Sequence, residues 1–197
     1  TYNLMRTFVA GLAFAMPFSL VYQMMSYRMK GLQKSEKVIK GLPFAAGFTA
    51  GTAVSIAGNM HYVIYAQIIP LIEKLTGKEV SGYWFPDATR YIGYNPYREE
   101  DRTIHEFPCY SFVLGDLHAH VVNIMFVLLV IALLYVWLRG VRKKTVPVET
   151  SMKDGKFWKE QLLMPHLLVI SALLGMFQWT NFWDFVIYYV VTLGTVL

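Results

Sequence analysis

Cysteine is nearly absent from this 197-residue sequence, in which Cys109 is the only one. A single cysteine excludes an internal disulfide framework and a metal site built from several thiolates, and it favours an apolar structural role for Cys109. Charged residues are also scarce, at 16% of the chain, whereas hydrophobic residues make up 55%. This balance is too apolar for an ordinary soluble domain and predicts an integral membrane protein.

Several common catalytic signatures are missing as well. The sequence contains no phosphate-binding glycine loop, no nucleophile elbow and no His-Glu-x-x-His motif. No cleavable signal peptide is apparent. The chain starts without methionine and stops inside an apolar run, so we expect it to be a fragment of a longer protein.

Long apolar stretches predict the fold class, which is all-α. A helix of about 20 apolar residues crosses a bilayer. We therefore expect a single membrane domain over residues 1–197, a polytopic bundle of about four complete spans and a partial fifth. The predicted spans are residues 4–26, 42–72, 121–138, 162–178 and 185–197.

The charges between these stretches predict the topology. Residues 28–40 and 139–160 each carry a net charge of +4, whereas residues 73–116 carry −3. The positive-inside rule puts the two basic segments in the cytoplasm and the segment 73–120 outside, in a bacterial or archaeal cytoplasmic membrane. We expect 73–120 to be a long aromatic loop on the interface or over the helices. The basic blocks fit lipid headgroups better than nucleic acid.

Polar or small residues stand out within the second predicted span. Gly47 and Gly51, four residues apart, would let a neighbouring helix approach closely. Asn59 and His61 are costly in lipid unless they are paired, which suggests either an interhelical hydrogen bond or a ligand. A transporter is a weaker alternative, because these two are the only strongly polar residues far from the ends of the predicted spans.

The strongest candidate for chemistry is the stretch around Asp116, His118 and His120. An extended backbone would put the three side chains on one side. If Asp116 instead opens a helix, its carboxylate would cap the first turn and the two histidines would diverge. The set suits a general base with substrate contacts, a Zn, Mn or non-haem iron site, or a structural cap.

Two further groups of polar residues accompany this stretch. Glu106 and Arg90 would either pair with each other or leave Arg90 to bind a phosphate. Near the last span, Trp179 and Trp183 flank hydrogen-bonding groups, which is the composition of a sugar site and also of an interfacial tryptophan belt. The hydrogen-bonding groups are Thr180, Asn181 and Asp184. The predicted topology brings Asp116 and Asp184 to the same, extracytoplasmic side.

Two motifs resemble the YYY family of large bacterial and archaeal multispanning membrane proteins, a family of unknown function. The first is EFPCYSFVLGDLHAH at residues 106–120, against NEFPFFSFLxGDLHPH in the family. The second is TNFWDF at residues 180–185, against TNTWDFP. The match includes Trp84, Arg90 and Thr103-Ile104 and covers about residues 41–197. The departures are His105 for Asn, Ala119 for Pro and Val186 for Pro, and they leave the motif acids and histidines in place.

The resemblance implies a distant relation to the GT-C glycosyltransferases, which use an acidic residue in an outer loop and take sugars from polyprenyl-phosphate carriers. It implies a catalytic set, a substrate-binding set and a divalent ion (Mn, Mg or Zn) as the possible cofactor, held by Asp116, His118 and His120. The catalytic set is Asp116, His118, His120 and Glu106, and the substrate-binding set is Arg90, Trp179, Asn181, Trp183 and Asp184.

The implied partners are the bilayer, the lipid-linked donor, and other membrane subunits or the remainder of a longer chain. The alternative hypothesis is a non-enzymatic membrane subunit that docks a partner complex. In that case the polar residues would lock the outer segment in place.

Overall fold

A computed structural model of the chain shows a mostly helical protein, which confirms the predicted class. The structure describes residues 1–30, 32, 35–78, 82–95, 98–143, 155 and 164–196, with the backbone alone for 91–95, 98–104 and 141–143. The chain divides into two compact units, residues 1–117 and 118–197, and each unit is described by itself.

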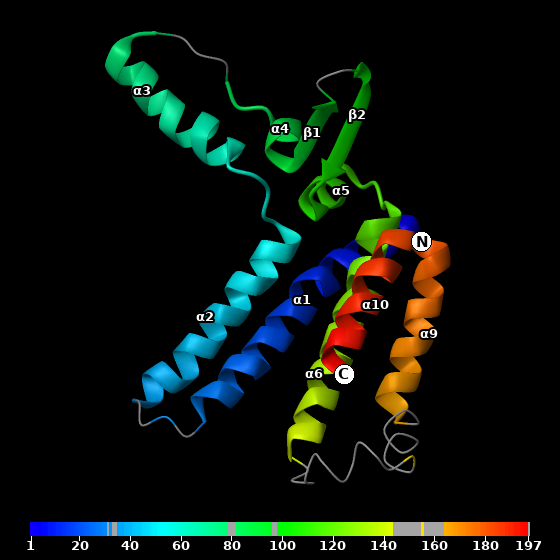
Figure 1. The fold of residues 1–197 in the computed structure, drawn as a ribbon. Helices are drawn as coiled ribbons and strands as arrows, with labels where there is room; N and C mark the ends of the chain where they lie inside the picture. Colours follow the sequence, from blue (N-terminus) through cyan, green and yellow to red (C-terminus); the bar gives the residue numbers. More distant parts are fainter. Residues whose placement is uncertain are drawn as a thin grey trace. The chain divides into compact units, whose positions relative to one another are not determined.

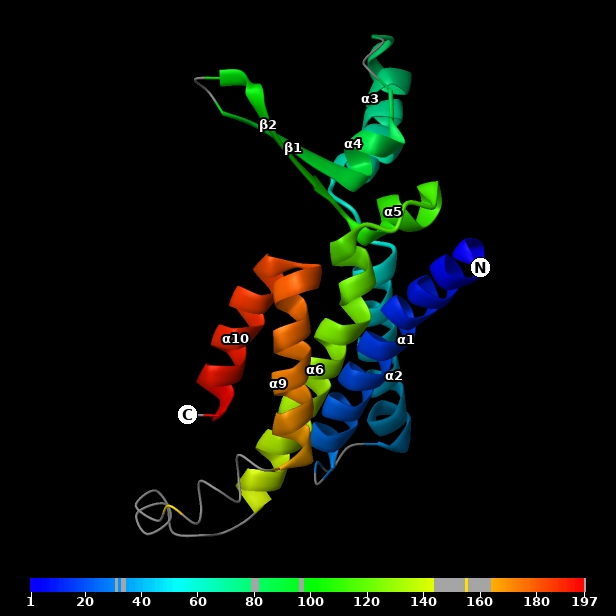
Figure 2. The same ribbon diagram turned by 90° about the vertical axis from the view of Figure 1, so that its right-hand side faces the viewer.

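Two long helices lie side by side in the first unit (Figures 1 and 2). They are α1 (Tyr2–Met29) and α2 (Glu36–Ser55). A Cβ atom added to Gly47 would lie 2.8 Å from the carbonyl oxygen of Phe18, and one added to Gly51 would lie 2.9 Å from that of Phe14. The predicted close helix approach at Gly47 and Gly51 is therefore confirmed. Beside this contact, the rings of Phe14 and Phe18 in α1 pack edge-to-face against two phenylalanine rings of α2.

Replacing Gly51 with alanine is expected to destabilise the protein by about 1–3 kcal/mol, because the new methyl group must push the α1 backbone away. Gly11→Ala is the matched control, since nothing lies within 4 Å of its added Cβ. Alanine favours a helix by about 1 kcal/mol relative to glycine, so the control should be neutral or stabilising. Unfolding in mixed detergent micelles measures both variants, and equal behaviour of the two would contradict the packing.

The stretch 42–72, predicted as one span, is not one helix. Helix α2 ends at Ser55, an irregular segment follows, and the chain continues as a π-helix η1 (Tyr62–Ile68) and α3 (Ile69–Thr76). The break arises because the backbone N–H of Asn59 donates to the carbonyl oxygen of Ala88 at 2.9 Å. Gly58 fits only because it lacks a Cβ, which would clash with that same carbonyl.

The segment predicted as a loop, 73–120, contains regular structure. It holds α4 (Phe85–Thr89), the antiparallel strands β1 (Arg90–Asn95) and β2 (Arg98–Glu106), and α5 (Pro108–Leu114). Figure 2 shows the hairpin extending from α4 and α5. Isoleucine, tyrosine and threonine favour strands at the paired positions, and the Asn95-Pro96 dipeptide is a turn signal. The sequence interpretation overlooked both signals.

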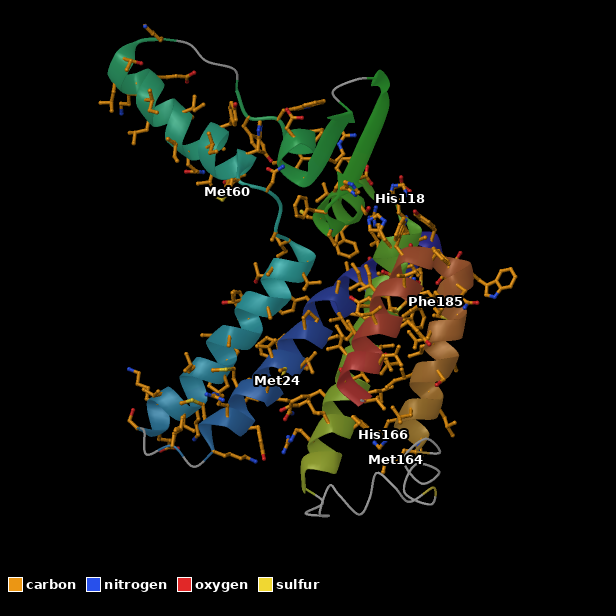
Figure 3. The ribbon with its side chains drawn as sticks, viewed as in Figure 1. Met24, Met60, His118, Met164, His166 and Phe185 are labelled. Carbon is orange, nitrogen blue, oxygen red and sulfur yellow. The ribbon has the colours of Figure 1, made fainter. Side chains whose placement is uncertain are left out.

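The second unit contains the helices α6 (Ala119–Lys143), α9 (Pro165–Thr180) and α10 (Phe182–Val196), all in mutual contact. Its core is an apolar seam between α6 and α9, made by Val130, Leu134, Trp137, Leu167, Ile170, Leu174 and Phe177. His118 and Phe185 lie toward one end of this unit and Met164 and His166 toward the other (Figure 3).

Two of the described helices, α1 and α6, are long and apolar enough to cross a membrane. Helices α9 and α10 are apolar but shorter, with 16 and 15 residues. The total of four spans and a partial fifth therefore stays a prediction. The predicted span starting at 162 and the last residue, 197, reach beyond the described residues.

Candidate functional site

Asp116 lies in a turn of residues 115–117, the Asp116 turn, where α5 ends. Gly115 has a φ of +78°, a conformation that glycine adopts without strain. The N–H groups of Gly115 and Asp116 donate to the carbonyl oxygen of Ser111 at 2.8 and 3.0 Å. The hydroxyl of Tyr2 donates to the Gly115 carbonyl at 2.8 Å and accepts from the Leu117 N–H at 3.0 Å. The backbone on both sides of Asp116 is therefore fixed by α1.

Arg6 lies one helical turn after Tyr2 and contacts the same turn. A Cβ added to Gly115 would clash with an Nη atom of Arg6 and would lie 3.2 Å from its Cζ. The guanidinium is thus packed against Gly115, the neighbour of Asp116. The contact brings the start of α1 and the Asp116 turn to the same end of the first unit.

Of the two backbone alternatives, the one in which Asp116 opens a helix is wrong. Helix α6 begins at Ala119, and the His118 carbonyl accepts the N–H groups of Val121 and Val122 at 3.0 and 3.1 Å. The rings of His118 and His120 do not diverge, because their centroids are 5.8 Å apart and their planes differ by 14°. Among the described residues, no three side chains of His, Cys, Asp or Glu gather as a metal site, so we assign no step to a metal.

Arg90 and Glu106 lie opposite each other on the paired strands β1 and β2. The Arg90 guanidinium lies 4.9 Å from the centre of the Tyr110 ring, which stacks on Phe85. Cation–π contacts of this kind stabilise a cation beside an apolar surface. Arg90 is therefore held near α5 by an aromatic pair.

The second motif forms a hydrogen-bond network in the second unit. Asn123, which is 2% exposed, donates from Nδ2 to Asp184 Oδ2 at 2.9 Å and to Thr180 Oγ1 at 3.1 Å. Asn181 Nδ2 donates to the same Asp184 oxygen at 3.0 Å. The network ties α6 to the junction of α9 and α10.

The two tryptophans of this motif are outside the network. Trp179 is 92% exposed and Trp183 is 71% exposed. This exposure favours the interfacial belt, one of the two interpretations of their sequence pattern, over the lining of a sugar pocket.

Three residues that matter here were not predicted as site residues. Arg6 and Asn123 each carried a signal, since a charged or amide side chain in an apolar stretch needs a partner. Tyr2 carried none, because a tyrosine near a membrane boundary is common in interfacial belts and its target lies 113 residues away.

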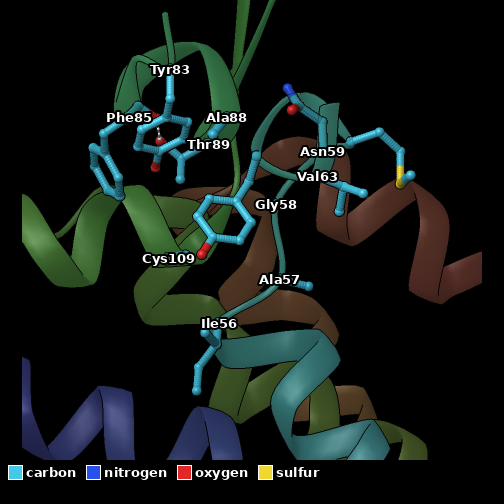
Figure 4. Close-up of a pocket in the computed structure, with 12 residues that line it drawn as sticks. Ile56, Ala57, Gly58, Asn59, Val63, Tyr83, Phe85, Ala88, Thr89 and Cys109 are labelled. Carbon is cyan, nitrogen blue, oxygen red and sulfur yellow. Dashed lines mark hydrogen bonds between the residues drawn. The ribbon is translucent and has the colours of Figure 1, made fainter. Parts of the chain in front are cut away.

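A pocket of about 440 Å³ lies in the first unit, above the end of α2 (Figure 4). Its walls come from the irregular segment after α2, from η1, from α4 and its preceding residues, and from Cys109. Asn59 faces this region, but its Nδ2 donates to the carbonyls of Asp87 and Arg90 and its Oδ1 accepts the His61 N–H. The Asn59 side chain thus joins backbone groups of three segments, which favours a structural hydrogen-bonding role for Asn59 over a role in binding a ligand.

Burial raises the pKa of the Cys109 thiol above its ordinary value. We expect alkylation of the folded protein near pH 8 to be slower than that of the unfolded chain, and to keep rising at higher pH, because the thiolate is the nucleophile. Because the folded state favours the neutral thiol, the contribution of Cys109 to the free energy of unfolding is fully present below the pKa of the unfolded chain. It is lost as the pH rises through the pKa of the folded protein. Identical rate profiles for folded and unfolded protein would contradict the burial.

These features together define a helical membrane protein with a structured segment between its apolar helices. The chain belongs to the family described as "Uncharacterized membrane protein (DUF2298)", whose model matches residues 1–197. No curated protein and no solved structure matches the chain.

Proposed function

We propose that the protein is a membrane glycosyltransferase of the GT-C type, which uses a polyprenyl-phosphate-linked sugar at an extracytoplasmic site around Asp116. The observation that carries the proposal is the Asp116 turn, in which Tyr2 fixes the backbone on both sides of a carboxylate and Arg6 adds a cation. This reaction needs a carboxylate that accepts a proton and a cation that neutralises the phosphate leaving group. The likeness of the two motifs to the YYY family supports the same class.

In the proposed reaction, a hydroxyl oxygen of the acceptor attacks the anomeric carbon of the sugar. Asp116 takes the hydroxyl proton as general base, and the bond from the anomeric carbon to the phosphate oxygen breaks, so its electron pair leaves with the polyprenyl phosphate. Basic groups near the phosphate neutralise the developing charge. The sequence motif supplies Glu106, His118 and His120 as further polar groups, and Arg90, upstream of the motif, is a further cation.

The test uses purified protein in lipid vesicles and a panel of polyprenyl-phosphate sugars with labelled sugar groups. The expected result is consumption of at least one donor, with release of an equal amount of polyprenyl phosphate. A folded protein that consumes no donor in the presence of a broad set of acceptors would contradict the proposal.

A structural membrane subunit is the second candidate, and the network around Asp184 favours it. The amides of Asn123 and Asn181 both bind the Asp184 carboxylate, so the second motif has an internal structural role. The exposed apolar surface of α9 and α10 would then face lipid, a partner subunit or the remainder of a longer chain. On this hypothesis, substitution at Asp116 lowers stability or releases a partner and changes no turnover.

A further inference from the structure

Helix α5 connects two features of the first unit. Cys109, its second residue, lines the pocket, and the Asp116 turn follows its last residue. A helix rises about 1.5 Å per residue, so the six residues from Cys109 to Gly115 separate the two features by about 9 Å. This separation along the axis is short compared with the length of a long-chain lipid.

The pocket suits an apolar group. Its volume of about 440 Å³ is within the range of small-molecule sites. Two of its polar side chains are already engaged: Asn59 binds three backbone groups, and the Thr89 hydroxyl donates to the Phe85 carbonyl at 2.7 Å. Most of the remaining lining is aliphatic or aromatic, with Ile56, Ala57, Met60, Val63, Tyr83 and Phe85 among it. A sugar would find few partners there, whereas a hydrocarbon chain would bury its surface.

The pocket also adjoins an apolar helix. Ile56, which lines it, directly follows the last residue of the apolar helix α2. At the other end of α5, Arg6 lies near the start of an apolar helix that is long enough to span a bilayer. A cation near a helix end of this kind attracts anionic headgroups. An arginine fork matches the oxygens of a phosphate.

We propose that the first unit binds a polyprenyl phosphate with its phosphate against Arg6, beside Asp116, and its first isoprene units in the pocket at Cys109. The inference rests on the proposed function, which supplies the isoprenoid carrier, and it names Arg6 as the principal phosphate ligand. Arg90, held over Tyr110, then has a secondary role.

Cys109 provides a readout that needs no turnover, because it is the only thiol of the chain. Its alkylation by a maleimide is followed by mass spectrometry, with the protein in phosphatidylethanolamine nanodiscs and no acceptor present. A long-chain polyprenyl phosphate is expected to slow alkylation at least tenfold. The uncharged polyprenol should need about tenfold more lipid for the same protection, since a charged hydrogen bond contributes about that factor.

Arg6→Gln should abolish the difference between the phosphate and the polyprenol, and Arg6→Lys should keep part of it. Arg28→Gln is the matched control, since Arg28 is an exposed arginine in the last turn of the same helix. Undiminished phosphate preference in Arg6→Gln, or equal protection by phosphatidylglycerol, would overturn the inference.

The same experiment separates the two proposals. Sugar transfer without protection of Cys109 would overturn this inference and leave the glycosyltransferase in place. Protection without transfer from any donor would support the lipid site and contradict the glycosyltransferase.

Discussion

Replacing Asn123 with leucine is expected to destabilise the protein by about 2 kcal/mol. The amide is buried in α6 and donates to both Asp184 and Thr180, and leucine has a similar volume but no donor. Hydrogen bonds between membrane helices average well under 1 kcal/mol, but a bond to a carboxylate is worth about 1.5–3 kcal/mol, and its loss leaves the charge with one donor fewer. The measurement is unfolding in mixed detergent micelles.

The control is Thr192→Val in α10, because the Thr192 hydroxyl donates to the Tyr188 carbonyl of its own helix. It should change the free energy of unfolding by less than about 0.5 kcal/mol. A double variant with Asp184→Asn should lose less than the sum of the two single changes, since the two residues share one bond. A strictly additive result would show that the Asn123–Asp184 hydrogen bond contributes nothing to the free energy of unfolding.

Hydropathy was enough to predict the long helices α1 and α6, because in lipid a long apolar run satisfies its own backbone groups as a helix. The stretch 4–26 lies within α1, and 121–138 lies within α6. The same signal failed at 42–72, where the break depends on a distant partner: the carbonyl of Ala88 binds the Asn59 backbone. Hydropathy does not carry that information, since Ile56 to Ile72 remains mostly apolar.

The site could be predicted only in part for a similar reason. The motif predicts Asp116 as the candidate acid, but the hydroxyl that holds the backbone of this turn comes from Tyr2, at the start of α1. For the second motif, the sequence left a sugar pocket and an interfacial belt open. The burial of Asn123 and the exposure of Trp179 do not follow from residue type alone, so both alternatives stayed open at the level of the sequence.

Asp116→Asn is expected to reduce the sugar-transfer rate by about 10²–10⁴-fold, because the amide does not accept the acceptor's proton. Asparagine has nearly the same size and tolerates turn conformations, and the bonds that Tyr2 and Ser111 make to this turn involve only its backbone. These backbone bonds should therefore be kept in the variant. Asp87→Asn is the matched control, since Asp87 is an exposed aspartate of α4 in the same unit.

The most direct test of the account is the rate of sugar transfer from saturating polyprenyl-phosphate donor, measured together with the melting temperature for wild type, Asp116→Asn and Asp87→Asn. The account predicts turnover by the wild type and by Asp87→Asn, and its loss in Asp116→Asn at an unchanged melting temperature. Absence of turnover in the wild type with every donor, together with a lowered melting temperature in Asp116→Asn, would contradict it and identify a structural subunit.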